Sequence, residues 1–528
     1  MRPLALVLAS ALVAAACGGG EDTAGNAPAG PPQRGGELTV LEDAAFGGGW
    51  PTGLDPATNS TGGANLSQMG AIYGGLFNLK ANDDGSNAKA VPNQAEGYKM
   101  LDGGKTVKIT IRDGIRFTDG TPMDAKAVAF NFRRAVGSPC TCAPIWPLEK
   151  NGITTEGERT VVLNFTRPFA PVINAFPVTN VNWIVSPTAL RKMGEKKFKI
   201  TPVGAGPFTV VTNKLSSELV LKRNPNYFKK GRPYLDRLTI KSIGGDQPAY
   251  QALLAGQADA YLGMNTEPLI EQARSGNQLT VATQPPTSPY VIQLNTKAKP
   301  FDNQRAREAI YYATDFDAIA KGLFKDRYPV SQGFTGPGGL FHHEKVPGYR
   351  EHNPQRARQI VNQLGGLTVN LGTLENYVAI QVMTALQTQW QKAGIKVNIK
   401  KYELSTLVQE FNNGNWQAML QTAGAWDPAA GVGVAFRFSN DSPFSGVNDQ
   451  KLDGLLNGAT ATLDNAERDR LYQQASKHIS DQAYAPFGLA FAPTNLAVDG
   501  VHGPGLTTKI PPIVVNSAVI WDEVWRTR

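Results

Sequence analysis

The strongest constraint on the fold is a strand pattern followed closely by a capped helix pattern. Residues 106–112 (TVKITIR) alternate apolar and polar side chains, as a half-buried strand does. Asp124 can then cap a helix whose apolar residues fall at positions i, i+3, i+4 and i+7 from Ala125. Strands that alternate with amphipathic helices are typical of α/β proteins.

A second unit of the same kind lies in the C-terminal half. Residues 378–393 have a helical pattern, Gly394 is the expected residue after the helix, and residues 395–399 alternate as a strand. Shorter patterns predict a first strand at residues 37–41 and a helix at 247–255. At roughly 150 residues per domain, 528 residues correspond to about three domains or lobes.

The N-terminus has the pattern of an export signal. Arg2 is followed by an apolar stretch over residues 4–16, which is too short to span a bilayer. The segment resembles a bacterial lipobox, with Ala14 where leucine is usual, and this implies that Cys17 becomes a lipidated first residue. We therefore expect a signal peptide at 1–16 and a flexible, lipid-anchored spacer at 17–35. The alternative is an ordinary secretory signal that is cut nearby.

The remaining cysteines and the charge give no cofactor or nucleic-acid signal. Cys140 and Cys142 either form a disulfide or remain two free thiols. The net charge is +8, but no run of five Lys or Arg concentrates it, so a solvated basic surface is favoured over nucleic-acid binding. His342, His343 and Glu344 are adjacent in sequence and lack the spacing of a metal site.

Enzyme motifs are also missing. Residues 103–106 (GGKT) end like a phosphate-binding loop, but Lys99 stands where its first glycine would be. No serine has glycines at both flanking positions of a nucleophile elbow. We expect a protein that is not an enzyme and that needs no cofactor or metal.

One segment resembles a family signature. Residues 95–98 (AEGY), 107–122 (VKITIRDGIRFTDGTP) and 127–130 (AVAF) resemble the signature of the family 5 extracellular solute-binding proteins, the peptide, dipeptide, nickel and oligosaccharide receptors of bacterial ABC importers. Further family-like pieces follow in the family's order: 54–56 (LDP), 202–208 (PVGAGPF), 224–227 (NPNY), 233–236 (PYLD), 256–259 (GQAD), 301–310 (FDNQRAREAI), 392–397 (KAGIKV) and 485–486 (AP). The likeness covers almost the whole chain after the spacer.

The resemblance implies a type II periplasmic-binding-protein fold, with two main lobes, a two-segment hinge and an inserted lobe. Lobe I would comprise residues 36–75, 186–285 and 485–528, lobe II 76–185, and lobe III 286–484. The hinge segments would lie near 288–295 and 485–491. The ligand would bind between lobes I and III.

The implied function is capture of a peptide or peptide-like solute by a monomer at the outer face of the cell membrane, for the permease and ATPase subunits of an ABC importer. Two alternatives stay open. One is an oligosaccharide or metal-chelate receptor of the same fold. The other is an envelope sensor that binds a signalling peptide and feeds no transporter.

The ligand-contacting residues are predicted from the same resemblance and from loop positions. The family's stretch W-x-x-D-x-x-D-P is shortened here to Trp426-Asp427-Pro428, so Asp427 either holds a ligand amine or is structural, and Trp426 either faces the cleft or is a core residue. Aromatic side chains between glycines and other loop residues complete the predicted site: Phe46, Trp50, Trp183, Tyr290 and Asn376.

Overall fold

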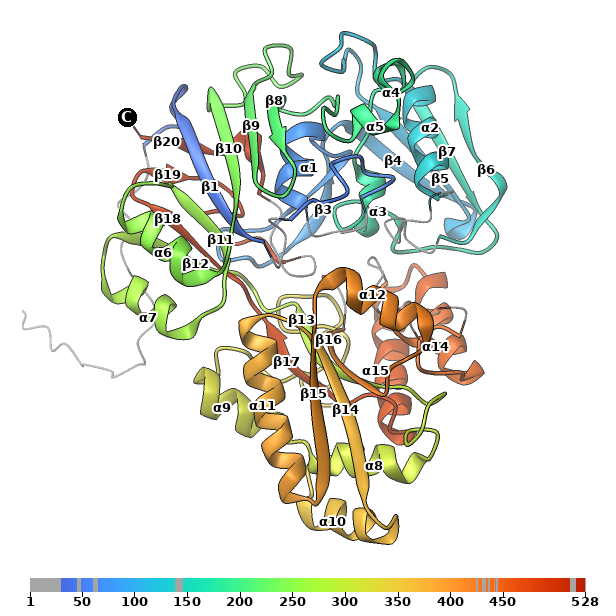
Figure 1. Cartoon of the computed structure of the whole chain (residues 1–528). Coiled ribbons are helices and arrows are strands. Elements are labelled where there is room, and N and C mark those ends of the chain that lie inside the picture. The colour runs from blue at the N-terminus through green and yellow to red at the C-terminus, as the bar shows by residue number, and fades with distance from the viewer. Residues whose placement is uncertain are drawn as a thin grey trace, which may run out of the picture.

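The protein is an α/β molecule, as Figure 1 shows for the computed structural model. Its described residues form sheets of seven, five and four strands and two further sheets of two strands each. The α/β class is therefore confirmed. The structure describes residues 30–44, 49–59, 65–136, 138, 146–423, 426–429, 434, 437–440, 442, 445–512 and 519–527. Phe46, Cys17, Cys140 and Cys142 lie outside the described residues.

Lobe I is a seven-stranded sheet of order β12-β18-β11-β1-β10-β9-β8. Its central strand β1 (Glu37–Asp43) pairs in parallel with β10 (Arg237–Ile243) and β11 (Ala260–Met264), which buries its apolar residues on both faces. The other members of the lobe are β8 (Phe208–Lys214), β9 (Glu218–Arg223), β12 (Leu279–Thr283), β18 (Thr494–Val498), α1 (Leu66–Tyr73), α6 (Asp246–Leu254) and α7 (Glu267–Ser275).

Lobe II is an antiparallel sheet of order β4-β5-β7-β6, preceded by the hairpin of β2 (Phe77–Lys80) and β3 (Lys89–Pro92). Strand β5 (Thr106–Ile111) buries every second residue, as its alternation predicted. Helix α2 (Ala125–Val136) contacts β6 and β7, and Asp124 Oδ1 accepts from the Ala127 amide at 2.8 Å, as a helix cap does. The lobe also contains β4 (Ala95–Leu101), β6 (Leu148–Glu156), β7 (Thr160–Phe165) and α3 (Val172–Ala175). The helices α4 (Pro187–Met193) and α5 (Glu195–Phe198) follow the expected end of this lobe at residue 185.

Lobe III is a five-stranded sheet of order β15-β14-β16-β13-β17, with helices on both faces. Helix α11 (Tyr377–Lys392) ends before Gly394, which has the positive φ of 87°, and β15 (Ile395–Tyr402) follows, as predicted. The remaining elements are β13 (Ser288–Leu294), β14 (Leu367–Leu374), β16 (Ala418–Thr422), β17 (Phe487–Phe491), α8 (Gln304–Ala313), α9 (Phe316–Phe324), α10 (Pro354–Gln363), α12 (Leu404–Asn413), α14 (Gln450–Ala461) and α15 (Asn465–Asp481). A two-stranded sheet of β19 (Val501–His502) and β20 (Trp525–Arg526) lies near the C-terminus.

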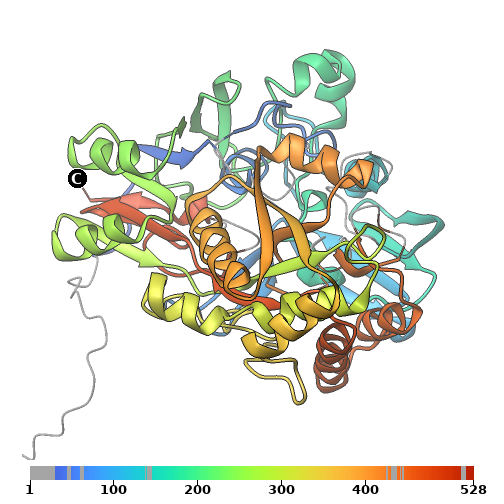
Figure 2. The ribbon, with the colours of Figure 1, turned by 60° about the horizontal axis from the view of Figure 1, so that its bottom comes forward.

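Two short crossings join lobes I and III. One runs from β12 to β13 and the other from β17 to β18, and the Gln284 amide donates to the Pro493 carbonyl between them at 2.9 Å. Because β12 pairs with β18 and β13 with β17, the crossings form one continuous strand pair (Figure 2). The hinge was expected at residues 288–295 and 485–491, but most of these residues form the fully buried strands β13 and β17 of lobe III. The change of sheet occurs at 284–287 and 492–493.

The described part of the chain contains no helix with the length and apolarity needed to cross a membrane.

Candidate ligand-binding cleft

The carboxyl ends of the parallel strands in lobes I and III face each other across the crossings. In lobe III, Tyr290 at the crossing end of β13 pairs with Thr422, the last residue of β16, and β14 runs parallel to β16. In lobe I, Met264 at the end of β11 pairs with Thr494 beside the other crossing, and β1 runs parallel to β11. Open α/β sheets bind ligands outside the carboxyl ends of their strands. The two sheets thus offer two such edges to one cleft.

Trp426 lies where lobe III meets the rest of the molecule. Its side chain is 2% exposed and packs in a small cluster with Leu79, Ile510 and Ile520. Leu79 belongs to the β2–β3 hairpin, and the two isoleucines belong to the C-terminal segment, so most of this cluster lies across the lobe boundary from the indole. Leu340 packs against the cluster from lobe III itself. The tryptophan also borders an open groove of about 780 Å³ between residues 82–89 and 337–340. That volume is in the range of small-molecule sites.

Asp427 is fully buried and has partners from two directions. Its oxygens accept from Arg468 Nη2 at 3.1 Å and from Asn174 Nδ2 at 2.9 Å, and Oδ1 also accepts from the Ala429 amide. Arg468 is 3% exposed and sits on α15, whereas Asn174 sits on α3 of lobe II. These contacts support the structural alternative for Asp427, because a carboxylate with this set of donors has less capacity for a ligand amine.

Trp50 lies in the core of lobe I. The side chain is 0% exposed, its Nε1 donates to Asn213 Oδ1 at 2.8 Å, and its amide donates to Ser216 Oγ at 3.0 Å. Although glycines precede this tryptophan in sequence, it is buried, because β8 and the turn after it supply hydrogen bonds for it and the core of lobe I packs around it. A contact between Trp50 and a ligand stays a prediction that the side chain's burial does not support.

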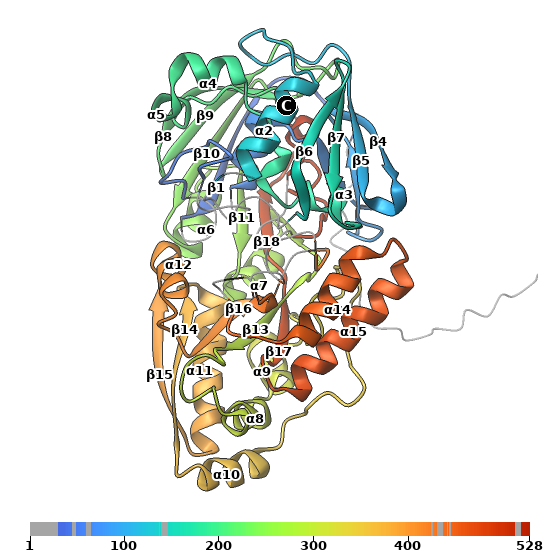
Figure 3. The same cartoon turned by 90° about the vertical axis from the view of Figure 1, so that its right-hand side faces the viewer.

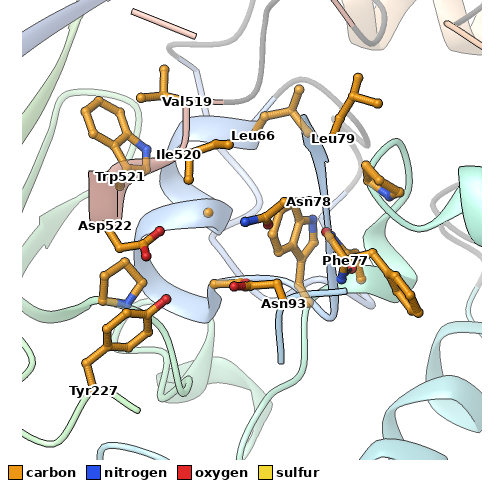
Figure 4. Close-up of a pocket in the computed structure, with 16 residues that line it drawn as sticks. Leu66, Phe77, Asn78, Leu79, Asn93, Tyr227, Val519, Ile520, Trp521 and Asp522 are labelled. Atoms are coloured by element: carbon orange, nitrogen blue, oxygen red, sulfur yellow. Dashed lines mark hydrogen bonds between the residues drawn. The ribbon is translucent and has the colours of Figure 1, made fainter. Parts of the chain in front are cut away.

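Trp183 borders a small, mostly apolar pocket of about 30 Å³ at the boundary of lobes I and II. Figure 4 shows Asn93 and Ile520 in the wall of this pocket. Trp183 Nε1 and Asn93 Oδ1 are buried without a partner among the described residues. A space of this size is too small for a peptide. Leu79 and Ile520 belong both to this wall and to the Trp426 cluster, so the structure brings the two tryptophans to neighbouring places.

The other two predicted residues lie at strand ends in lobe III. Tyr290 is 4% exposed and packs against Phe491, with ring centroids 6.3 Å apart. Asn376 caps α11, where its Oδ1 accepts from the Ala379 amide at 2.9 Å. Asn376 is half-buried just after β14, at the cleft edge, whereas Tyr290 belongs to the lobe III core.

Direct contacts link lobe III to both other lobes. Arg167 of lobe II donates to Thr460 Oγ1 at 2.6 Å and to Asn457 Oδ1 at 2.8 Å, both on α14. Arg327 of lobe III pairs with Glu267 of lobe I and donates to Thr494 Oγ1 at 2.9 Å. Figure 3 shows α14 and α15 directly below the lobe II sheet. The cleft is therefore bounded by lobe contacts on two sides.

Two ionisable residues at the strand ends were missed by the sequence reasoning. Glu42, near the end of β1, is 1% exposed; burial raises its pKa to about 7, although hydrogen bonds from Ser67 and Gln68 oppose that rise. Arg437 lies beside Gln421 of β16. The available signals were a carboxylate directly after an apolar strand (ELTVLED) and an arginine within an apolar run (GVGVAFRFS).

Comparison with known proteins identifies the family. Residues 89–443 match the bacterial extracellular solute-binding proteins, family 5. The chain belongs to this family. The glutathione-binding protein GsiB of Salmonella paratyphi A is 30% identical to this solute-binding protein over 448 residues, which cover 80% of this chain and 84% of the relative.

Solved structures confirm the type II periplasmic-binding-protein fold. DppA of Helicobacter pylori, solved with the peptide STSA, aligns with a TM-score of 0.78 at 20% identity and covers 94% of this chain and 99% of its own. AgaA of A. tumefaciens, solved with agropinic acid, aligns with a TM-score of 0.78 at 22% identity, covering 93% and 99%. The family resemblance of the sequence is thus confirmed, and the chain is an extracellular solute-binding protein.

Proposed function

We propose that this solute-binding protein captures a peptide or peptide-like molecule between lobes I and III and delivers it to the permease and ATPase subunits of an ABC importer. The observation that carries the proposal is the pair of facing carboxyl strand edges, which two short crossings of the chain connect. Short strand crossings let two lobes move as bodies about a hinge. Ligand enclosed between them favours the closed arrangement only through its tighter binding to that state.

The choice of a peptide is supported by relatives. GsiB is named for glutathione, and DppA was solved with a peptide. AgaA was solved with agropinic acid, so the fold also serves non-peptide solutes. An oligosaccharide or metal-chelate ligand, or a role in sensing without transport, remains the alternative. We infer that the protein acts by binding alone and works as a monomer.

Membrane attachment is proposed through lipidation of Cys17. The sequence around this cysteine supports it: small residues precede Cys17 and a Gly- and Pro-rich spacer follows. Replacing Cys17→Ala should leave the protein unprocessed or released from the membrane, as followed by fractionation and mass spectrometry of the N-terminus. Normal processing and membrane retention of this variant would exclude the anchor.

The ligand can be tested on the soluble chain without its anchor. Native mass spectrometry of gently purified protein identifies any co-purified solute. Peptides, oligosaccharides and nickel chelates are then compared by thermal unfolding and small-angle scattering. A true ligand at 100 times its dissociation constant should stabilise the fold by about 2.7 kcal/mol.

The scattering result separates binding in the cleft from binding elsewhere. A peptide that raises the melting temperature and also reduces the radius of gyration supports the proposal. Stabilisation without compaction contradicts capture between moving lobes. If oligosaccharides or metal chelates reduce the radius of gyration and peptides do not, the ligand belongs to the alternative class of oligosaccharides or chelates. Solute uptake is then compared in cells with and without the permease that is proposed to work with this protein. Loss of uptake without the permease supports import, and unchanged uptake favours a role in sensing.

A further inference from the structure

Arg437 is a half-buried cation whose buried Nε has unused hydrogen-bonding capacity. Its Nη2 donates to Gln421 Oε1 at 3.3 Å, whereas its Nε is buried without a partner. No carboxylate among the described residues forms an ion pair with it, and burial is the one cause that shifts its pKa, which falls to about 10. The guanidinium therefore keeps its charge at neutral pH, and no described carboxylate offsets that charge.

The neighbouring amide has the same deficiency. Gln421 Nε2 is also buried without a partner, while its Oε1 is taken by Arg437. Both unused groups are N–H donors, and an unsatisfied buried donor or an unpaired buried charge is destabilising. The group that would satisfy them is an acceptor with negative charge. A carboxylate has two acceptor oxygens, and the fork of an arginine matches it.

The two side chains lie at the ligand-facing end of lobe III. Gln421 immediately precedes Thr422, the last residue of β16, and is paired across the sheet with Val291 next to the crossing strand pair. Past the end of β16, Trp426 packs against residues from outside lobe III. Arg437 is therefore held beside the strand edge that faces lobe I. By contrast, the buried Arg468 already has Asp427 as its partner.

We propose that Arg437 and the side-chain amide of Gln421 bind a carboxylate of the captured solute. The proposal deepens the function proposed above and rests on it for the position of the ligand in the cleft. It makes the protein selective for acidic or zwitterionic solutes over their neutral analogues. It also assigns the recognition of a negative ligand charge to a cation of lobe III, whereas the sequence left Asp427 open as either a partner of a ligand amine or a structural residue.

The test compares ligands that differ only in the carboxylate. The probes are a pool of tripeptides with free carboxyl termini, the same pool as carboxyl-terminal amides, and glucuronic acid beside glucose. Apparent affinities from thermal-shift titrations are measured for the wild type, Arg437→Gln and Arg356→Gln. Arg356 is exposed on α10, at the far end of lobe III in Figure 1, and controls for the loss of one positive charge.

The wild type should prefer the free acids by about 30-fold or more, because removing one member of a buried charge pair weakens binding by several kcal/mol. Arg437→Gln should lose this preference through weaker binding of the acids, with the affinity for the amides unchanged. Arg356→Gln should behave as the wild type does. Equal wild-type affinities for tripeptide acids and amides would overturn the inference and leave the proposed peptide function intact.

Two further results separate the inference from the function. In the first, the wild type binds glucuronic acid and neither tripeptide pool, and Arg437→Gln abolishes that binding. This result would reject the peptide ligand and retain the carboxylate site. Unfolding of the ligand-free protein tests a structural role: Arg437→Gln should melt no lower than Arg356→Gln, because it removes a half-buried charge that no described carboxylate compensates. A melting temperature lower by more than a few degrees would show that Arg437 supports the fold and would overturn the inference.

Discussion

The loops after β1 and after β16 occupy equivalent places in lobes I and III, at the carboxyl end of a parallel strand, yet they bury their tryptophans differently. Trp50 is enclosed by its own lobe, with hydrogen bonds to Asn213 and Ser216. Trp426 is enclosed mainly by residues from outside its lobe, including Leu79 and Ile520, with Leu340 as a neighbour from lobe III. The first tryptophan therefore contributes to the folding of a lobe and the second to the contact between lobes.

The buried carboxylates of the two regions differ as well. Glu42 in lobe I accepts a hydrogen bond from Gln68 Nε2 at 2.7 Å, and no described cation pairs with it, whereas Asp427 in lobe III is paired with Arg468. Burial raises the pKa of the Glu42 carboxyl group. The two strand ends thus each bury a carboxyl group, one without a described cation and the other within an ion pair.

Trp50→Ala should have the largest effect on folding. Removing a fully buried tryptophan costs about 3–5 kcal/mol of unfolding free energy, and the Asn213 contact is lost with it. Chemical denaturation of the ligand-free protein measures this, and the fraction that remains folded should bind ligand normally. A variant with unchanged stability and lost binding would instead place Trp50 in contact with the ligand.

Asp427→Asn should cost about 3–5 kcal/mol, because it leaves Arg468 buried without an anionic partner. Asp481→Asn is the control, since it removes an exposed pair with Lys477 and should cost less than about 1 kcal/mol. Equilibrium denaturation compares the two variants. A stable Asp427→Asn protein that loses affinity only for peptides with a free amino terminus would show that Asp427 holds a ligand amine.

Glu42 should make stability depend on pH. Its pKa is about 7 in the folded protein and 4.5 as an ordinary glutamate, so its proton is bound more tightly in the folded state. The stabilisation is complete below pH 4.5 and is lost as the pH rises through 7, which amounts to on the order of 3 kcal/mol.

Glu42→Gln should therefore flatten the stability profile between pH 5 and 8 and make the variant the more stable protein at pH 8. The exposed Glu37→Gln variant is the control, measured by the same series of melting curves. Parallel profiles for the wild type and Glu42→Gln would show that the carboxylate is ionised in the folded protein throughout this range.

Trp426→Ala should have the smallest effect on the ligand-free fold. Its packing partners lie mainly across the lobe boundary, so the lost apolar burial of about 2 kcal/mol should weaken ligand affinity by tens-fold and hinder compaction. Calorimetry and small-angle scattering measure the two effects. A loss of 3–5 kcal/mol in ligand-free stability, similar to that of Trp50→Ala, would make Trp426 a core residue and remove the distinction between the two loops.

Local patterns were sufficient for the elements of the fold. The alternation in residues 106–112 predicts β5, Asp124 predicts the start of α2, and Gly394 predicts the turn into β15. These features depend on side chains within one strand or one helical turn, so neighbouring residues determine them. The ordered family-like segments likewise identified the fold, because each piece encodes a local turn or strand in a fixed order.

The site depended on residues that are distant in sequence. Trp50 is buried by Asn213, which is 163 positions away, and Asp427 is neutralised by Arg468 and contacted by Asn174, which is 253 positions away. The sequence alone determined that an α/β solute-binding protein would form and which loops would follow its parallel strands. Only the tertiary structure decided which aromatic and charged side chains in those loops are enclosed by their own lobe, because burial and pairing depend on contacts between chain segments whose sequence separation carries no local pattern.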